Sequence, residues 1–253
     1  MLPLLLALAA CTDPDADTGA ETAEPDPMAD WVVGDGPLAP VSGRAFVFGP
    51  SGNLSLEGAA VFVVEAPEYA TTAEADGTFA LEVPSGRPLS FRVEQEGFTA
   101  IQSGTLPVGP EGVTQLGFQV PITGTTEMMA YASDIHLDED RCQIATTISS
   151  ASSPPYGGSG VGEPGATAIL EPFPSEDAEG PIYFDFINDG FVLPDPTLTE
   201  TTIDGGVLFG NVPQGEYTLR ATHPTVRFTE VTIRCRAGVV VNASPPHGVE
   251  FLE

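Results

Sequence analysis

The second half of this 253-residue chain repeats the pattern of the first half. A Gly-Ala segment followed by apolar residues occurs at 58–62 and again at 165–169. An Asp-Gly pair leading to Val-Pro-x-Gly occurs at 76–86 and again at 204–215. Matching segments in the same order indicate two copies of one structural unit. The spacing between the two motifs is longer in the second copy, which predicts an insertion near 172–196.

Apolar and polar residues alternate within the first copy, as in Thr78–Val83 and Leu89–Val93. A period of two, interrupted by Gly and Pro, indicates antiparallel strands with one buried face. Asp76-Gly77 predicts a tight hairpin turn. We expect seven strands in the first copy, at 41–48, 58–65, 69–74, 78–83, 89–95, 98–103 and 112–120.

These elements predict an all-β protein of two tandem seven-stranded antiparallel Greek-key β-sandwiches, joined by a short helical connector. The two modules are expected over 31–124 and 141–253, and the connector over 125–140. Within the connector, Thr126 could cap a short, partly amphipathic helix. We expect this helix to pack between the modules.

Charge excludes one class of partner. The chain has 36 acidic residues against eight basic ones, all of them Arg, so its formal net charge is −28. Binding to nucleic acid requires a basic patch that neutralises phosphates, and this chain cannot assemble one. The absence of Lys also excludes Schiff-base and Walker-type lysine chemistry.

The N-terminus resembles a bacterial lipoprotein signal. Residues 1–10 carry an apolar run too short to span a bilayer, and small residues precede Cys11. Cys11 is therefore the expected lipidation site. Residues 11–30 are acidic and lack an apolar face, which predicts a disordered tether. We expect a lipid-anchored protein of the bacterial cell envelope, at the outer membrane, facing either the periplasm or the outside.

The other two cysteines fit the same compartment. Cys142 and Cys235 lie in strand-like segments with no C-x-x-C motif or His cluster beside them. In an oxidising compartment we expect them to form a disulfide. Two buried free thiols are the alternative.

The repeat also resembles a known family. Gly43-Arg44, Gly58–Val61, Asp76–Phe79, Val83–Gly86 and Gly97-Phe98 resemble the motifs of the carboxypeptidase regulatory-like domain, which is a transthyretin-like β-sandwich. The resemblance covers about 41–120 well and the second copy less well. It implies a seven-stranded sandwich in each copy.

A zinc site is the main enzymatic alternative. His136 and Glu139 have the H-x-x-E spacing of zinc carboxypeptidases, and His223 or His247 could be a third ligand. A catalytic zinc needs three ligands, an open position and a shaped cavity. Because nearly all residues outside 121–140 are assigned to two small sandwiches, we expect no zinc peptidase.

Three further motifs are assigned to loops. Asp134, Asp138 and Asp140 could offer oxygen ligands to calcium, but the EF-hand glycine and closing glutamate are missing. Residues 133–136 resemble the opening motif of metallophosphoesterases without its later elements. Residues 160–165 satisfy G-x-G-x-x-G but follow a Pro/Ser/Gly loop instead of a strand. We expect no metal, no cofactor and no catalytic residue.

We therefore expect a non-catalytic, lipid-anchored envelope or surface protein that displays two β-sandwich modules to a protein or glycan. A carbohydrate-binding accessory module is the alternative, and an undetected hydrolase is a third. Tyr183, Phe184, Phe186 and Phe191 form the aromatic cluster that could stack on sugars, although a hydrophobic edge of the core is favoured. The partner, the oligomeric state and the side of the membrane stay open.

The Cys11 assignment predicts a change in location. Cys11→Ser should move the protein from the membrane fraction to the soluble fraction, because a serine cannot carry the thioether-linked lipid. Fractionation of cells labelled with a fatty acid measures both location and acylation. A variant that stays in the membrane with unchanged acyl label would contradict the assignment.

Overall fold

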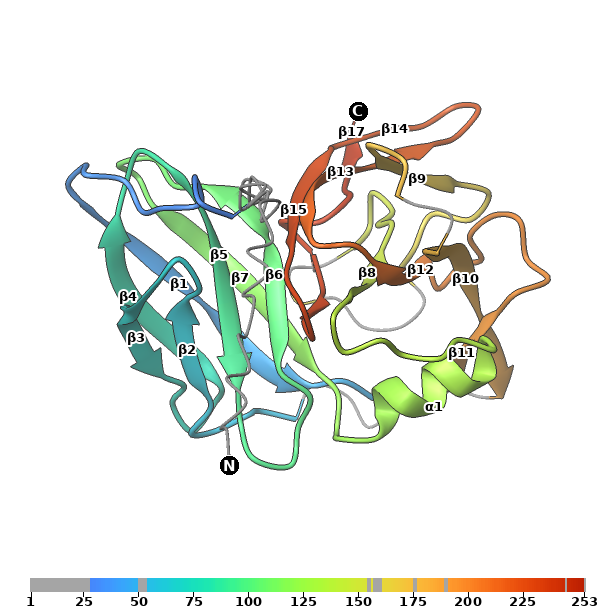
Figure 1. Cartoon of the computed structure of the whole chain (residues 1–253), viewed down its shortest axis with the longest axis horizontal. Helices are drawn as coiled ribbons and strands as arrows, with labels where there is room; N and C mark the ends of the chain where they lie inside the picture. The colour runs from blue at the N-terminus through green and yellow to red at the C-terminus, as the bar shows by residue number, and fades with distance from the viewer. Residues whose placement is uncertain are drawn as a thin grey trace, which may run out of the picture.

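The computed structural model describes residues 28–49, 54–153, 156, 161–174, 177–188, 191–243 and 245–252. Cys11, the expected signal segment and nearly all of the expected tether lie outside the described residues. The described chain is mostly strand with one short helix, so the prediction of a β protein with sandwich-like sheets is confirmed (Figure 1). No helix among the described residues has the length and hydropathy needed to cross a membrane.

The first half is a sandwich of two layers. One layer has the strand order β4-β1-β7 and the other β3-β2-β5-β6. Its core contains Phe79, Phe91 and Phe118, which extend from both layers into the space between them. The strands are β1 (Leu38–Val47), β2 (Ala60–Val63), β3 (Ala66–Thr72), β4 (Thr78–Pro84), β5 (Pro88–Glu94), β6 (Ile101–Pro107) and β7 (Val113–Val120).

The sheets are mixed, so the prediction of purely antiparallel strands is wrong. The strands β1 and β7, the first and last of the first sandwich, pair in parallel, with Ala45 opposite Phe118. Parallel neighbours need a long crossover connection. The five intervening strands supply this connection. The alternation of apolar and polar residues within a single strand does not show whether its neighbour is parallel, so the sequence could not reveal this pairing.

The Asp76-Gly77 turn has a different role from the hairpin predicted for it. It lies between β3 and β4, which belong to opposite layers, and therefore carries the chain from one sheet to the other. Gly77 has φ 80°, and Gly205 at the matching position has φ 74°. Glycine adopts this left-handed conformation at little cost, so both Asp-Gly pairs form the same kind of turn. In the second half the turn precedes β12 and follows β11, which lies in the same layer, so there it does not cross between layers.

The second half repeats this pairing scheme. The order β12-β8-β16 matches β4-β1-β7, again with one antiparallel and one parallel pair. The order β9-β13-β15 matches β2-β5-β6. The strands are β8 (Cys142–Thr147), β9 (Thr167–Glu171), β10 (Glu179–Asn188), β11 (Phe191–Asp195), β12 (Gly206–Val212), β13 (Gly215–Thr222), β14 (Arg227–Phe228), β15 (Val231–Cys235), β16 (Val240–Val241) and β17 (Phe251–Leu252).

The second half is not the seven-stranded sandwich that we predicted. Residues expected as an insertion form the β10–β11 hairpin, which extends the layer beyond β12. A short β14–β17 pair is also added. Among the described residues, no strand occupies the place that β3 has in the first half.

The two halves share one sheet, which differs from the predicted tandem of separate modules. One edge of β6 pairs with β5, and the other pairs with β16 at Ile101 and Gln102 and with β15 at Thr105. Figure 1 shows β6 beside β15 at the junction of the two sandwiches. An unpaired strand edge readily accepts another strand, and here the second half occupies it.

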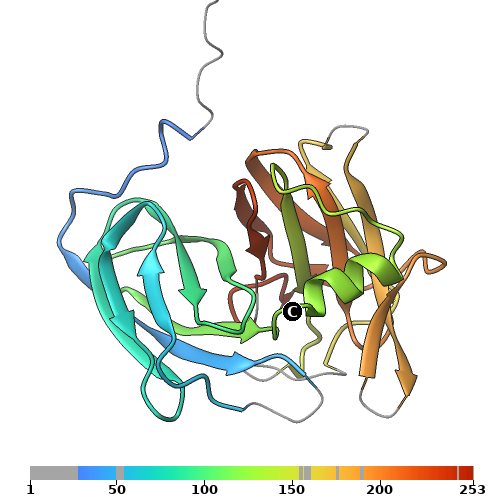
Figure 2. The ribbon, with the colours of Figure 1, turned by 60° about the horizontal axis from the view of Figure 1, so that its bottom comes forward.

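Helix α1 (Thr125–Ala132) connects the halves and lies against the added hairpin, on the side seen in Figure 2. Its N-cap is Gly124, with no side-chain capping bond, so the prediction that Thr126 caps the helix is wrong. The helix and its C-terminal extension pack on Phe184, Val192 and Leu208, which belong to β10, β11 and β12.

The predicted disulfide is present between Cys142 in β8 and Cys235 in β15. Both side chains are fully buried, and their Cα atoms are 5.4 Å apart. Because β8 and β15 belong to opposite layers, the bridge links the two layers of the second sandwich.

This bridge closes a loop with a sequence separation of 93 residues. Replacing both cysteines with Ala should lower the unfolding free energy by about 4–5 kcal/mol on the chain-entropy estimate. Urea unfolding of the variant and of oxidised wild type measures the difference. Equal midpoints for reduced and oxidised wild type would contradict a stabilising bridge.

Candidate functional site

A buried ion cluster joins the two sandwiches. Glu65, in the turn between β2 and β3, has a fully buried side chain. Its Oε1 accepts hydrogen bonds from Arg234 Nη1 at 3.0 Å and from Arg236 Nη2 at 2.7 Å. Burial lowers the pKa of Arg236, whereas the carboxylate of Glu65 acts in the opposite direction. We call Glu65, Arg234 and Arg236 the seam cluster.

Neighbouring groups hold the seam cluster in place. Ser90 donates its backbone N–H to Glu65 Oε2 at 2.9 Å. Gln102 of β6 accepts from Arg236 at 2.8 Å and donates to the Arg234 carbonyl at 2.8 Å. Buried charges are tolerated when paired and hydrogen-bonded, and these contacts provide both.

Trp31 covers the seam cluster. Its ring lies 5.3 Å from the Arg234 guanidinium carbon and 4.8 Å from that of Arg236, which is cation–π geometry. The segment that follows the expected tether is therefore in contact with the junction of the two halves.

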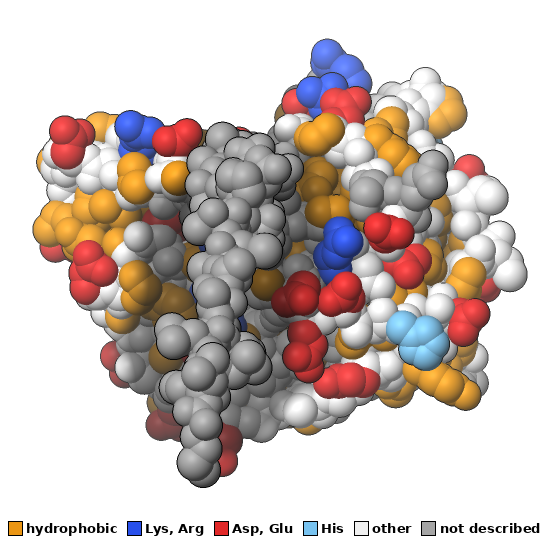
Figure 3. Space-filling model, in the orientation of Figure 1, with side chains coloured by type: hydrophobic (Ala, Val, Ile, Leu, Met, Phe, Trp, Pro, Cys, Tyr) orange, Lys and Arg blue, Asp and Glu red, His pale blue; other side chains and the backbone are white. Residues whose placement is uncertain are grey.

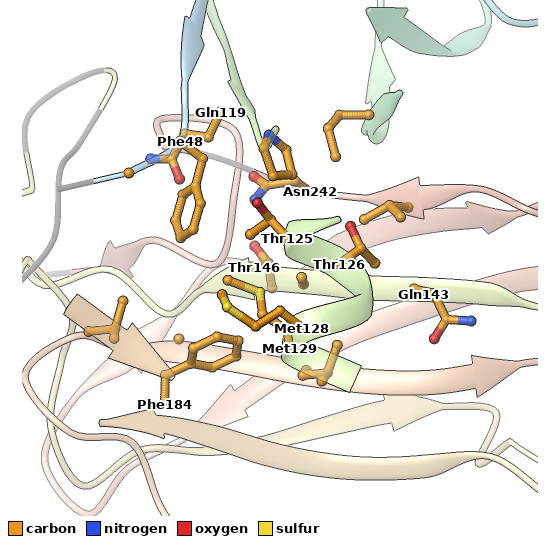
Figure 4. A pocket seen from close by; sticks show the side chains of 18 of the residues that line it. Phe48, Gln119, Thr125, Thr126, Met128, Met129, Gln143, Thr146, Phe184 and Asn242 are labelled. Atoms are coloured by element: carbon orange, nitrogen blue, oxygen red, sulfur yellow. The ribbon is translucent and has the colours of Figure 1, made fainter. Parts of the chain in front are cut away.

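A second feature of the junction is an apolar pocket of about 290 Å³. Its walls come from both sandwiches and from α1. The side chains of Phe48, Met128, Met129 and Phe184 converge on it (Figure 4). Pockets between structural units, apolar with a few polar groups, are the usual form of small-molecule sites.

The polar groups of the pocket are amides and hydroxyls. Gln119, Thr125 and Asn242 lie together near Phe48 (Figure 4). Thr146 donates its hydroxyl to the Ala243 carbonyl at 2.8 Å. Among the described lining residues, only Asp204 is ionisable. The pocket can therefore hold an apolar molecule with a hydrogen-bonding group.

The three histidines considered as zinc ligands each take part in a hydrogen bond within the protein. The His136 carbonyl accepts from Asn211 Nδ2 at 2.8 Å. His223 Nδ1 accepts from the Thr225 backbone N–H at 3.2 Å. The Nε2 of His247 is 2.6 Å from the Thr114 carbonyl, so it contacts the first sandwich. Within the described ranges, no three His, Cys, Asp or Glu side chains gather as a metal site would require.

The acidic and glycine-rich motifs are loops where they are described. Asp138 Oδ1 accepts the Asp140 backbone N–H at 2.9 Å. Asp134 has φ 58° at the end of the helix. Gly160 lies outside the described residues, and Gly162 forms an isolated bridge with Ser149.

The predicted aromatic cluster is mostly internal. Tyr183 and Phe184 are buried, and burial raises the pKa of Tyr183. The Tyr183 hydroxyl accepts the Ala168 backbone N–H at 3.0 Å. Phe186 packs at the edge of the apolar cluster beneath α1. The side chain of Phe191 lies outside what the structure describes.

Sequence reasoning missed the seam cluster. Arg234 and Arg236 flank Cys235 two positions apart, a spacing that places two side chains on one face of an extended chain. In a chain with only eight basic residues, such a pair in an apolar strand was a signal for a buried counter-charge. The position of Glu65 opposite them could not be read from the sequence.

No protein-family model and no curated protein matches the chain. Among solved structures it is similar to the Bacillus anthracis TIE protein, with 12% identity and TM-score 0.28 over 85% of this chain and 34% of that one. The chain thus spans about a third of that protein. It is also similar to shaft pilin SpaA from Lactobacillus rhamnosus GG, with 9% identity and TM-score 0.25 over 86% and 99% of the two chains. A third is GBS52, the minor pilin of Streptococcus agalactiae, with 9% identity and TM-score 0.23 over 85% and 97%. TM-scores this low do not establish a shared fold.

The seam cluster predicts a large effect of one substitution. Glu65→Gln should lower the unfolding free energy by about 3–5 kcal/mol, because it removes the ion pair of Arg236 and leaves the buried Arg234 with Glu216 alone. Urea unfolding measures the loss. The matched control is Glu68→Gln, which makes the same change at an exposed position of β3 and should cost at most about 0.5 kcal/mol. Equal stabilities of the two variants would contradict a structural role for the cluster.

Proposed function

We propose that this protein is a non-catalytic, lipid-anchored protein of the bacterial envelope that displays its two joined sandwiches to a protein partner. The observation that carries the proposal is the junction itself. A shared strand edge and a buried ion cluster hold both halves as one body, and Trp31 fixes the segment after the expected tether to the same place. Such an arrangement suits presentation of a surface at a distance from the membrane.

The carbohydrate-binding alternative has less support. Stacking on sugars needs exposed aromatic faces. Tyr183 and Phe184, the centre of the expected aromatic cluster, are buried instead. Phe173, with 83% of its surface exposed, lies outside that cluster. A protein partner is therefore favoured over a glycan.

The apolar surface around α1 is the favoured contact region for that partner. Ile122, Met128, Tyr131 and Leu137 are exposed, and Tyr131 is 88% exposed. Ile122, Met128 and Leu137 line the pocket, and Leu137 also lines a shallow hollow that includes Tyr131. We call these four residues the helix patch. Contiguous apolar patches of this kind often mark interaction sites. On the face shown in Figure 3, acidic side chains outnumber basic ones, which would favour a basic partner surface.

Site-specific crosslinking in intact cells tests this proposal. A photo-crosslinker near the helix patch should yield a discrete adduct with an envelope protein. Tyr131→Glu should reduce adduct yield about tenfold, because an aromatic anchor is lost and a charge is added. The matched control is Phe173→Glu, the same kind of change at another exposed aromatic, and it should leave the yield unchanged. A yield insensitive to Tyr131→Glu, or equally sensitive to both changes, would contradict the proposal.

A further inference from the structure

The pocket at the junction shares Ile122, Met128 and Leu137 with the helix patch, but the display function proposed above does not use its interior. Its walls include Phe48 from the end of β1, Met128 and Met129 from α1, and Phe184 from β10. The pocket thus exists only where the two sandwiches and the helix meet. Methionine side chains adapt to ligands of different shape, and two of the four methionines of the chain line this one space.

The size and lining of the pocket define the ligand's body. A volume of about 290 Å³ is at the lower end of small-molecule sites. It suits a short aliphatic chain or a fused-ring body. Because most lining groups are apolar, water in the pocket would find few hydrogen-bond partners and is readily displaced by such a body.

The polar groups and charge define the ligand's head. Gln119, Thr125 and Asn242 offer amide and hydroxyl groups near one another, which suit a hydroxyl, carbonyl or amide. No described lining residue is basic, and the ionisable one, Asp204, is acidic. An anionic head would therefore lack a counter-charge, within a chain whose net charge is −28.

We propose that this pocket binds an uncharged amphiphile, with its apolar body between Phe48, Phe184 and the α1 methionines and its hydrogen-bonding head near Asn242. This inference does not depend on lipid anchoring or on a protein partner, because it concerns the isolated chain. Its test uses purified full-length protein and is separate from crosslinking in cells.

The test compares two fluorescent probes that share the same aromatic rings. N-phenyl-1-naphthylamine is uncharged, whereas 8-anilino-1-naphthalenesulfonate carries a sulfonate. We expect saturable, one-to-one binding of the uncharged probe. The affinity for the sulfonate probe should be at least about tenfold lower, because the pocket offers no counter-charge. Decanol should displace the uncharged probe, and decanoate at pH 8 should do so poorly for the same reason.

Two pairs of variants locate the binding. Ala145, partly buried on β8, faces the pocket, so Ala145→Phe should fill it and weaken probe binding about tenfold or more. Ala80→Phe makes the same change on the exposed face of β4 and should have no effect. If Ala145→Phe fails to fold, Met128→Glu tests the same prediction at a position that is 40% exposed, and it should weaken probe binding. Tyr131→Glu on the same helix is its control and should leave probe binding unchanged.

Three results would overturn the proposal. The first is no saturable binding of the uncharged probe to wild type. The second is unchanged binding in a folded pocket variant, either Ala145→Phe or Met128→Glu. The third is equal affinity for the two probes, which would remove the requirement for an uncharged ligand.

Discussion

The free edge of β6 is the constraint on which the whole arrangement depends. In the first sandwich β6 is the last strand of its layer, and one edge would otherwise present unpaired N–H and C=O groups. The second half meets this edge with β15 and β16. Because a strand can pair along an edge only at discrete registers, this pairing restricts how the second sandwich can be placed against the first.

The seam cluster makes that placement specific. The guanidinium groups of Arg234 and Arg236 share the carboxylate of Glu65, which is the acidic partner from the first sandwich. Glu216 pairs with Arg234 from within the second sandwich. Moving the second sandwich along β6 would separate Arg234 and Arg236 from Glu65 and leave that buried carboxylate unpaired, which is costly. Main-chain pairing alone tolerates slippage, so the ion pairs supply the penalty against alternative registers.

The pocket is a consequence of the same placement. Once β6 holds the two sandwiches together, α1 must bridge them, and the β10–β11 hairpin provides the surface on which the helix packs. The helix covers part of the gap between the sandwiches without filling it. A connector and an insertion, which look like additions to a regular repeat, therefore form the walls of the candidate ligand site.

The repeat itself was readable because its signals are local. Alternation in Thr78–Val83 and the preference for glycine at 77 and 205 depend only on neighbouring residues, so the sequence predicted the strands and the positions of these turns. The pairing of Cys142 with Cys235 was predicted because they are the two cysteines other than Cys11 and the expected compartment is oxidising. Burial of one face of each strand explains the alternation, and the ability of glycine to adopt positive φ explains the turns.

The sequence by itself thus determined a β protein with an internal repeat, an insertion and one disulfide. Tertiary structure alone decided which strands pair across the repeat, that Glu65 faces Arg234, and that Phe48 and Phe184 approach one pocket. These contacts join residues more than a hundred positions apart. Their partners are selected by strand register and by the pairing of buried charge, neither of which is encoded in any short stretch of sequence.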